Sequence, residues 1–353
     1  MKKRKKLWIT TGILAVVVTL GMYFTYPLRV TLAGTLLTTQ HPQYAWVTLI
    51  GQDKINELRN KSLKPIVVNT LIMAPIRKPL TEEMITSAIP VPEVKEDLKT
   101  HYVEFERNFS PTHYFKGRLV TVNDATKVRL VPATIHDKGT KRERGEWLEE
   151  IVKTNNAIVA LNASGFSDPG GKSWASHPMG LVIIDGEVIQ DYDVNANSTA
   201  LGITYDGRLI TGKFTSEELL NFGVRDAVSF KPQLIVDGKS LFPDESSEWG
   251  YQPRSAVGQT EDGSIVLIQI DGRKAESIGA SMKDMADILL EYGVVNAMAM
   301  DGGTSAFLSY NGETKTVSPV SDKRGRFLPN AWVVVPDEDE KVDMAYADKV
   351  DIK

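Results

Sequence analysis

The stretch SMKDMADILLEYGVVNAMAMDGGTS, residues 281–305, contains a helix pattern, a strand pattern and a glycine-rich loop in direct succession. Ser281 and Asp284 have the spacing of a helix N-terminus, apolar residues then recur on one helical face, and Gly293 is typical of a helix end. The apolar run Val294–Met300 predicts a buried strand. This part of the chain therefore predicts a mixed fold in which a strand delivers an aspartate into a loop.

Short turn signals separate apolar runs elsewhere in the chain. Asp-Gly and Asn-Gly pairs supply the positive φ angles of tight hairpin turns, so the runs on either side are expected to pair as strands. The pairs are Asp185-Gly186, Asp206-Gly207, Asp237-Gly238, Asp262-Gly263 and Asn311-Gly312. Further strands are expected at Arg118–Val122, Lys127–Val131 and Ala157–Leu161, with a helix at Gly145–Val152. We predict an α+β fold of strand-rich mixed sheets with a few packed helices.

A basic head and an apolar run open the sequence. Lys2–Lys6 are all basic, and Leu7–Tyr26 contains no ionisable acid or base other than tyrosine. Such a run can span a bilayer core of roughly 30 Å as a helix. We expect a single-pass signal anchor in the cell membrane, with the basic head in the cytoplasm and the rest extracytoplasmic. A cleavable signal peptide is the alternative, although its shorter apolar region would end in small residues rather than Met22-Tyr23-Phe24.

Composition limits the class of protein. The chain has 353 residues, 42% hydrophobic and 24% charged, which is ordinary for one large or two small globular domains. Without Lys2–Lys6 it carries 36 Lys and Arg against 45 Asp and Glu, a formal net charge of about −9. This acidic balance argues against a nucleic-acid partner. The absence of cysteine excludes disulfides and thiolate chemistry, and fits a bacterial cell surface better than a eukaryotic secretory lumen.

Changes in composition indicate five parts of the chain. They are a basic head at 1–6, the transmembrane anchor at 7–26, a stalk or packing arm at 27–95, the main domain at 96–337 and a charged tail at 338–353. Short helices are expected in the arm at 51–58 and 81–88. The charged tail after Pro336 is expected to be frayed.

The segment NASGFSDPGGKSW, residues 162–174, looks like a phosphate-binding loop but lacks its spacing. Gly165 lies one residue too far from Gly171-Lys172-Ser173, and no helix pattern follows. A nucleotide site is therefore not expected. Lys172 and His177 could contact another ligand, although a solvated side chain is the more common state of a lone lysine or histidine.

Polar residues follow three of the predicted strands. The segments are Asn162–Phe166, Asp271–Arg273 and Asp301–Ser305. Strand ends that lead into loops often hold catalytic and binding groups, because the sheet fixes the backbone. Taken alone, each segment could be a cap, a hairpin turn or a bulge. Their joint occurrence favours a site.

Five segments between residues 145 and 335 together resemble the phosphodiester glycosidase family. In chain order they are Ile158–Phe166, Pro178–Gly186, Pro253–Gly258, Asp271–Arg273 and Asn296–Ser305. The order, the spacing and the helix between the last two make the resemblance specific. Ser164 and Ser167 replace a glycine and an aromatic residue that are common in the family, and Thr304 keeps a hydroxyl at its position.

The resemblance implies hydrolysis of the glycosidic bond of a sugar-1-phosphodiester. Asp301 and Asp271 are the candidate catalytic carboxylates, with nucleophile and base unassigned. A phosphate leaving group carries negative charge, so Arg254 and Arg273 are expected to stabilise it as further catalytic residues. The residues expected to bind the sugar or the phosphate are Asn162, Gly165, Phe166, Gly302, Gly303, Thr304 and Ser305.

Cofactor and partners are also expected from these patterns. No zinc-type histidine spacing and no calcium-loop pattern is present, so no cofactor is expected to be required, with a divalent cation on Asp301 or Asp271 as the alternative. The expected substrate is a phosphodiester-linked glycan of the cell envelope. The alternative function is a non-catalytic module of the same fold that binds envelope glycans or assembles exopolysaccharide.

Overall fold

The computed structural model describes residues 21–39, 42–63, 67–70, 97–134, 136–137, 143–167, 174–191, 198–243 and 249–347. The chain divides into two compact units, one of residues 1–64 with 247–251 and one of residues 65–246 with 252–353. The predicted head, most of the predicted anchor, the helix expected at 81–88 and Lys172 lie outside the described residues. All predicted catalytic residues belong to the second unit.

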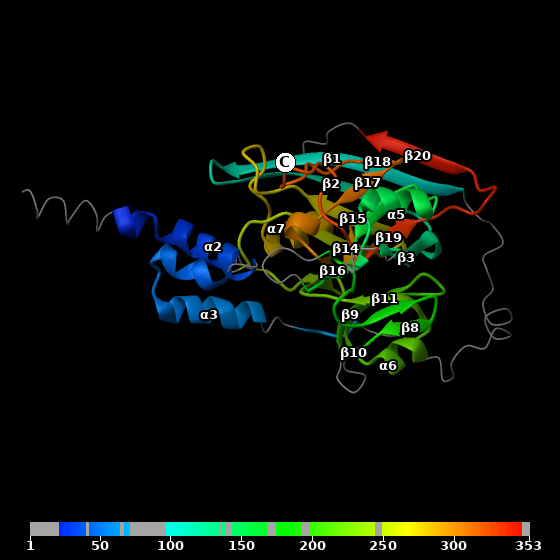
Figure 1. The fold of residues 1–353 in the computed structure, drawn as a ribbon, viewed down its shortest axis with the longest axis horizontal. Helices are drawn as coiled ribbons and strands as arrows, with labels where there is room; N and C mark the ends of the chain where they lie inside the picture. Colours follow the sequence, from blue (N-terminus) through cyan, green and yellow to red (C-terminus); the bar gives the residue numbers. More distant parts are fainter. Residues whose placement is uncertain are drawn as a thin grey trace, which may run out of the picture. The chain divides into compact units, whose positions relative to one another are not determined.

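The first unit is helical and is coloured blue in Figure 1. Helices α2 (Tyr26–Leu37) and α3 (Gln52–Leu63) flank the 3-10 helix η1 (Pro42–Thr48), and α3 contains most of the helix expected at 51–58. A small buried cluster holds the three together; it consists of Ala33, Ala45, Ile50, Ile55 and Leu58. From residue 21 onward, in the described ranges, no helix is both long and apolar enough to cross a membrane.

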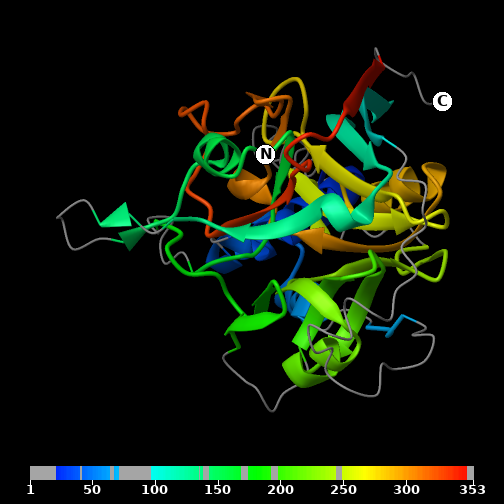
Figure 2. The same cartoon turned by 90° about the vertical axis from the view of Figure 1, so that its right-hand side faces the viewer.

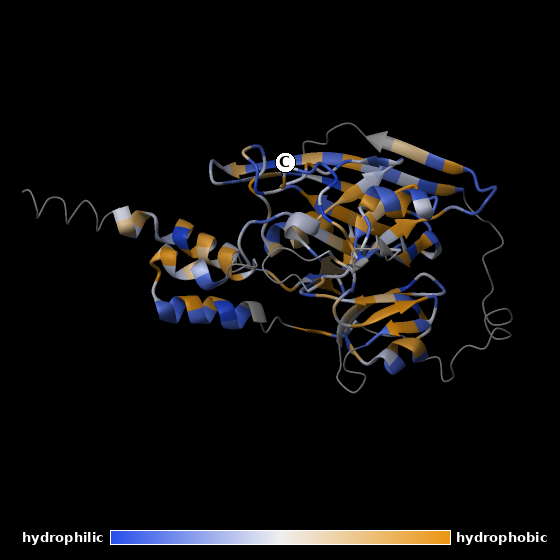
Figure 3. Ribbon diagram, viewed as in Figure 1, coloured by the Kyte–Doolittle hydropathy of each residue, from blue (hydrophilic) through white to orange (hydrophobic). Residues whose placement is uncertain are grey.

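The largest sheet of the second unit has eight strands. They are β1 (Leu98–Ser110), β2 (His113–Val122), β12 (Gln233–Val236), β13 (Lys239–Ser240), β14 (Arg254–Thr260), β15 (Ile265–Ile270), β16 (Val294–Met300) and β20 (Val342–Ala347). Their order is β13-β12-β16-β14-β15-β2-β1-β20. All residues of β15 are buried, whereas β1 has both buried and exposed positions. Figure 3 shows hydrophobic and hydrophilic residues mixed along β1. The predicted catalytic residues lie at the ends of the central strands β14, β15 and β16.

Two five-stranded sheets complete the main core. One contains β3 (Val128–Pro132), β6 (Val159–Asn162), β17 (Leu308–Tyr310), β18 (Glu313–Thr314) and β19 (Asn330–Val334). The other contains β7 (Val182–Ile184), β8 (Glu187–Gln190), β9 (Ser198–Thr204), β10 (Leu209–Phe214) and β11 (Val224–Ser229), and Figure 2 shows it in green below the other strands. A short ribbon pairs β4 (His136–Asp137) with β5 (Glu143–Arg144). One apolar cluster includes buried residues of all three large sheets, such as Tyr102, Trp332 and Leu201.

In the part of the chain that the structure describes, three helices pack on these sheets. Helix α7 (Met282–Glu291) contacts β12 and β16, α5 (Leu148–Thr154) contacts β6, and α6 (Ser216–Asn221) contacts β11. The predicted N-terminus of α7 is confirmed, because the Ser281 hydroxyl accepts from the amide of Asp284 at 3.1 Å and the Asp284 carboxylate accepts from the amide of Ser281 at 2.7 Å. The strand-rich α+β class is confirmed.

The five predicted hairpin turns are confirmed, since each pair connects neighbouring antiparallel strands. The helix expected from Gly145 begins later, at Leu148. Gly145 lies in extended chain, where a Cβ would stand 2.2 Å from the carbonyl oxygen of Leu328. This close approach keeps the residue outside the helix.

The prediction of a frayed tail is wrong for residues up to Ala347. Lys127, which is buried, binds the carboxylates of Asp337 at 2.6 Å and Glu340 at 2.8 Å. The chain then continues into β20, which pairs in parallel with β1. Two acidic residues of this charged segment therefore bind the buried Lys127.

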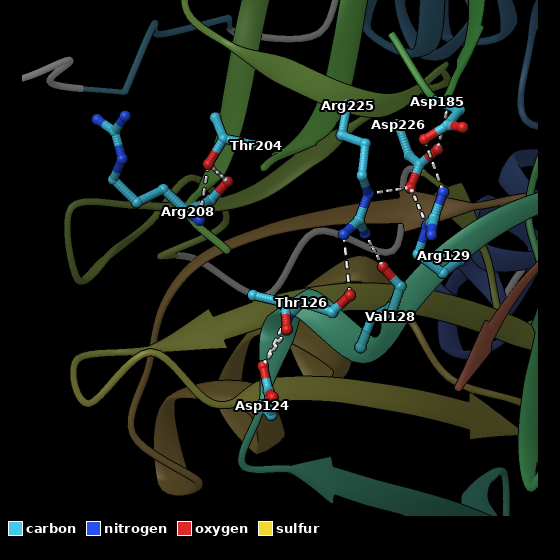
Figure 4. A network of polar contacts seen from close by, with 9 residues as sticks. All are labelled: Asp124, Thr126, Val128, Arg129, Asp185, Thr204, Arg208, Arg225 and Asp226. Carbon is cyan, nitrogen blue, oxygen red and sulfur yellow. Dashed lines mark hydrogen bonds and ion pairs between the residues drawn. The ribbon is translucent and has the colours of Figure 1, made fainter. Parts of the chain in front are cut away.

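A buried ion-pair network connects β11 with β3 (Figure 4). Asp226 is 0% exposed, and its Oδ2 accepts from Arg225 at 2.7 Å and from Arg129 at 3.2 Å. Arg225 also donates to the carbonyl oxygens of Thr126, at 2.9 Å, and Val128. The network thus joins the two five-stranded sheets through side chains of opposite charge that neutralise one another.

We predict that Asp226→Asn lowers the free energy of unfolding by about 3–5 kcal/mol, because it leaves the buried guanidinium of Arg225 without its counter-ion. Asp185→Asn is the matched control. Asp185 also pairs with Arg129, at 3.0 Å, but its side chain is 68% exposed, so a loss below about 1 kcal/mol is expected. Urea unfolding of both variants tests the difference. Equal losses would contradict it.

Candidate active site

The predicted catalytic residues come from three adjacent strand ends. β14 runs antiparallel between β15 and β16, and its register pairs Arg254 with Ile270 and Ser255 with Met300. The start of β14 therefore lies beside the ends of both neighbours. Since Asp271 follows Ile270 and Asp301 follows Met300, the sheet brings these groups to one edge.

The glycines of the site bring backbones together. A Cβ on Gly272 would stand 2.6 Å from the nitrogen of Pro253, and a Cβ on Gly302 would stand 2.9 Å from its carbonyl oxygen. That oxygen also accepts from the amide of Gly303 at 2.9 Å. Pro253 thus lies between the loops that follow β15 and β16. A close backbone approach to a ligand was expected at Gly302 and Gly303. In the structure both glycines instead lie close to the backbone of Pro253.

Asn162 holds the loop of Asp301 from the side of β6. The Asn162 side chain, 0% exposed, donates from Nδ2 to the carbonyl oxygen of Asp301 at 2.6 Å. Its Oδ1 accepts from the hydroxyl of Ser255 at 2.7 Å and from the amide of Phe307 at 3.1 Å. These bonds join β6, β14 and the chain around β16. Asn162 is therefore bound to the protein through both atoms of its amide.

The rest of this loop is also fixed. Ser164, the residue that replaces a family glycine, exchanges two bonds with Asn330, since its amide donates to Oδ1 and its hydroxyl accepts from Nδ2, each at 2.9 Å. A Cβ on Gly165 would stand 2.9 Å from the ring of Phe230. The serine thus has a structural partner that sequence patterns do not reveal.

Asp271 is enclosed by protein groups. Its side chain is 2% exposed, and Oδ2 lies 2.5 Å from the guanidinium of Arg118. Oδ1 accepts from the amide of Val317 at 3.0 Å and from the side chain of Gln269 at 3.2 Å. Both carboxylate oxygens are therefore engaged within the fold.

Asp301 is more accessible than Asp271, with its backbone bound and its side chain half-buried. Its amide donates to the carbonyl oxygen of Ala163 at 3.1 Å. Loss of solvation lowers the pKa of Arg273, and the negative charge of Asp301 opposes that shift. The carboxylate therefore acts electrostatically on the arginine of the neighbouring loop.

Arg254 is a buried cation beside a second cation. It is 7% exposed, and its Nε donates to the carbonyl oxygen of Ala280 at 3.1 Å. Burial and then the charge of Arg273 lower the pKa of Arg254 to about 9, against an opposing effect of Asp284. Two guanidinium groups that repel each other gain from an anion between or beside them.

Arg273 lies in an uncommon backbone conformation. Its φ of 60° is in the left-handed region, which a non-glycine residue rarely adopts. Its amide donates to Ile278 at 3.2 Å and its Nη2 donates to Gln252 at 2.9 Å. Residues in sparsely populated backbone conformations are found both in turns and at active sites.

The remaining predicted residues lie around this edge. Phe166 and Thr304 are half-buried, and both contact Arg326: the guanidinium stands 4.8 Å from the ring centroid of Phe166 and 3.5 Å from the hydroxyl of Thr304. Ser305 is buried in the 3-10 helix η5 (Gly303–Ser305). His177 is exposed and contacts Ser176 at 3.0 Å.

Sequence reasoning missed several residues that build the site. They are Arg118, Gln252, Ser255, Arg326 and Asn330. Each acts through a partner distant in the sequence, so no local motif identifies it. Within the described ranges, no group of three or more His, Asp or Glu residues could hold a metal ion. A cavity of 510 Å³ lies near the turn between β1 and β2 and is lined by none of the predicted site residues.

Comparison with known proteins gives one family. Residues 155–335, more than half of the chain, match the family described as phosphodiester glycosidase. The SPbeta prophage-derived uncharacterized protein YomE of Bacillus subtilis is 29% identical over 271 residues, which are 73% of this chain and 37% of that protein. The N-acetylglucosamine-1-phosphodiester alpha-N-acetylglucosaminidase of Bos taurus is 29% identical over 191 residues, 49% of this chain and 35% of the enzyme. The chain thus spans little more than a third of the length of these relatives.

The fold is also found among solved structures. The catalytic domain of zebrafish N-acetylglucosamine-1-phosphodiester alpha-N-acetylglucosaminidase, auto-inhibited by its pro-peptide, superposes with a TM-score of 0.57. The two chains are 20% identical, and the match covers 69% of this chain and 85% of that one.

Gly303→Ala and Gly312→Ala form a matched pair of variants. Both glycines have positive φ angles, 60° and 74°, so alanine costs each about 1–2 kcal/mol of stability. Only at Gly303 would the added methyl group meet another side chain, 3.2 Å from Nη2 of Arg273; nothing lies within 4 Å at Gly312. We expect similar losses of unfolding free energy, but phosphate binding weakened about tenfold in Gly303→Ala alone. Equal phosphate affinities by calorimetry would contradict this role of the contact.

Proposed function

The chain belongs to the phosphodiester glycosidase family, as its motifs predicted, and on this premise we propose that it hydrolyses the glycosidic bond of sugar-1-phosphodiesters. The bond between C1 and the phosphate oxygen breaks with its electron pair on the oxygen. Water supplies the hydroxyl group at C1 and a proton, so the products are a free sugar and a phosphomonoester. The observation that carries the proposal is the pair Arg254 and Arg273 beside Asp301.

The two arginines suit a phosphodiester. A guanidinium can meet two phosphate oxygens at once, and the negative charge on the leaving oxygen grows as the glycosidic bond breaks. Arg254 is held through its Nε and Arg273 through Gln252, so neither has to reorganise when that charge develops. A bound phosphate would also relieve the repulsion that lowers the pKa of Arg254.

Asp301 is the carboxylate that we assign to the anomeric carbon. It is half-buried, at a strand end, and its backbone is fixed by Ala163 and Asn162. Its charge can stabilise an oxocarbenium-like transition state, as nucleophile or as base. Asp271 would have to give up Arg118 or the amide of Val317 to reach a substrate, so we assign it to the support of the loop that carries Arg273.

The predicted binding residues also divide into an accessible group and a buried group. Phe166 and Thr304 are half-buried and are proposed to contact the sugar or the phosphate. Asn162 and Ser305 are buried and are proposed to position Asp301 and its loop. The backbone of Gly302 and Gly303 can approach a ligand on the side away from Pro253.

We propose that the protein acts outside the cell membrane on phosphodiester-linked glycans of the envelope. The basic head and the apolar run Leu7–Tyr26 support an anchor. Tyr23 and Phe24, each 74% exposed, suit a membrane interface, where aromatic residues are enriched. No cofactor is proposed, and a chelator is expected to leave turnover unchanged.

Asp301→Asn is predicted to lower kcat at least about 10³-fold with an unchanged unfolding midpoint. Asp271→Asn is predicted instead to lower the free energy of unfolding by about 3–5 kcal/mol, because it leaves Arg118 buried without a counter-ion. The assay is release of p-nitrophenyl phosphate or free sugar from sugar-1-phosphodiesters by the full chain in detergent, with and without EDTA.

Several outcomes would change the assignment. Full activity of Asp301→Asn would remove it from the reaction. A folded parent protein that binds such ligands without turnover, with affinity unchanged in Asp301→Asn, would favour the glycan-binding or exopolysaccharide-assembly module. Loss of turnover in EDTA would assign a divalent cation to the aspartates.

Phosphate affinity is predicted to fall as pH rises through about 9. Only the protonated guanidinium attracts the anion, and the pKa of Arg254 in the free protein is about 9, so this attraction is lost as the pH rises through that value. Arg254→Gln should bind about tenfold more weakly and show no step near this pH. Calorimetric titration with inorganic phosphate from pH 7.5 to 10.5 measures both. A parent curve without a step would contradict the assigned role of Arg254.

A further inference from the structure

A group of aromatic and guanidinium side chains lies on three segments near the candidate active site. We call it the aromatic strip; it consists of Arg144, Trp147, Trp174, Arg324 and Phe327. The ring of Phe327 lies 4.3 Å from that of Trp147 and 5.8 Å from that of Trp174, between centroids. Trp174 and Phe327 are stacked at 14°, and 39% of Trp174 is exposed.

The strip is held by backbone bonds between its segments. The amide of Gly145 donates to the carbonyl of Trp174 at 2.8 Å, and Glu146 and Leu328 exchange two bonds at 3.1 and 2.7 Å. The lack of space for a Cβ at Gly145 shows how closely these segments pack. The backbones that carry the rings are therefore held together before any ligand arrives, which reduces the entropy cost of binding.

Cations flank the rings of the strip. The guanidinium of Arg324 stands 3.7 Å from the ring centroid of Trp147, and that of Arg144 stands 4.6 Å from the centroid of Phe327. Arg324 also binds Asp322 at 2.9 Å, and Arg144 binds Glu150 at 3.0 Å. These contacts fix both guanidinium groups beside the aromatic faces.

The strip is continuous with the candidate active site through Arg326. This residue precedes Phe327 in the chain, and it contacts Phe166 and Thr304 of the site at 4.8 and 3.5 Å. A ligand that extends from the loop of Asp301 past Thr304 would next meet the strip.

We propose that the aromatic strip binds the glycan chain beyond the linkage that is cleaved. A sugar ring would stack on the exposed face of Trp174, and phosphate groups of the chain would meet Arg324 and Arg326. Exposed Trp and Arg side chains on a rigid surface contribute most to binding at protein interfaces, and an aromatic face suits the apolar face of a sugar ring. This inference rests on the proposed function and specifies its substrate as a phosphodiester-linked polymer.

A role in packing alone does not explain the arrangement. Trp332, in the core, is 0% exposed, whereas Trp174 presents 39% of its surface to solvent. Single exposed aromatic residues are common on protein surfaces, but Trp174 is stacked on Phe327 and lies beside cationic side chains that lead to the candidate active site. The exposed fraction is therefore the part available to a ligand.

The test compares Trp174→Ala with the parent on two substrates of identical linkage. One is a small sugar-1-phosphodiester, and the other is an oligomer of several sugars joined by phosphodiesters. For the full chain in detergent, we expect KM for the oligomer to rise about tenfold, while kcat/KM for the small substrate stays within about twofold. Trp174→Phe should retain most of the oligomer affinity. Phe109→Ala, which removes an exposed aromatic near the turn between β1 and β2, should change neither value.

Each outcome decides the proposal. Unchanged KM for the oligomer in Trp174→Ala, or an equal loss on both substrates, overturns it. If the parent binds the oligomer without turnover, the dissociation constants from calorimetry replace KM, with the same tenfold expectation. If the parent neither cleaves nor binds either substrate, the proposed function fails and the inference fails with it. An oligomer-specific loss in Arg324→Gln would support the strip further.

Discussion

The buried side-chain amide of Asn162 connects several segments of the second unit. Asn162 offers both atoms of its side-chain amide to groups of other segments: the carbonyl of Asp301, the hydroxyl of Ser255 and the amide of Phe307. Each of these groups would cost about 1–3 kcal/mol if it were buried without a partner. The interaction that joins the sheet of β6 to the sheet of β14 therefore also fixes the loop of the candidate catalytic carboxylate. Fold stability and site geometry are coupled through the same three bonds.

Electrostatic strain is concentrated at this edge of the sheet. Arg254 is buried next to Arg273, and Arg273 adopts a left-handed backbone conformation. Neither arrangement favours the fold by itself, and both arginines are held by hydrogen bonds, Arg254 to Ala280 and Arg273 to Gln252. Groups with perturbed pKa values and strained backbones are common where a ligand of opposite charge is bound. The rest of the unit supplies the stability that this edge lacks.

Local signals in the sequence predicted the structural features that depend on neighbouring residues. Ser281 and Gly293 mark the ends of the helix before β16, and Asp-Gly pairs mark the hairpins, because caps and turns depend on a few adjacent residues. The contacts of Ser255 and Arg326 were not predictable in this way, since their partners Asn162 and Thr304 lie far away in the sequence. The strand ends that carry polar residues were identified, but the burial of Asp271 depends on Arg118, which only the pairing of β15 with β2 brings near.

The parallel pairing of β1 with β20 has a consequence for how the fold is reached. Among the described strands of the second unit, β1 comes first along the chain and β20 comes last, yet they are neighbours in the largest sheet. Contacts of such long sequence separation form slowly, because a large loop must first close at a cost in conformational entropy. The edge of β1 therefore stays unpaired until the final strand has left the ribosome. A nascent chain halted before Val342 would present the part of that edge that β20 covers, Leu98–Val103, to any other extended segment in its surroundings.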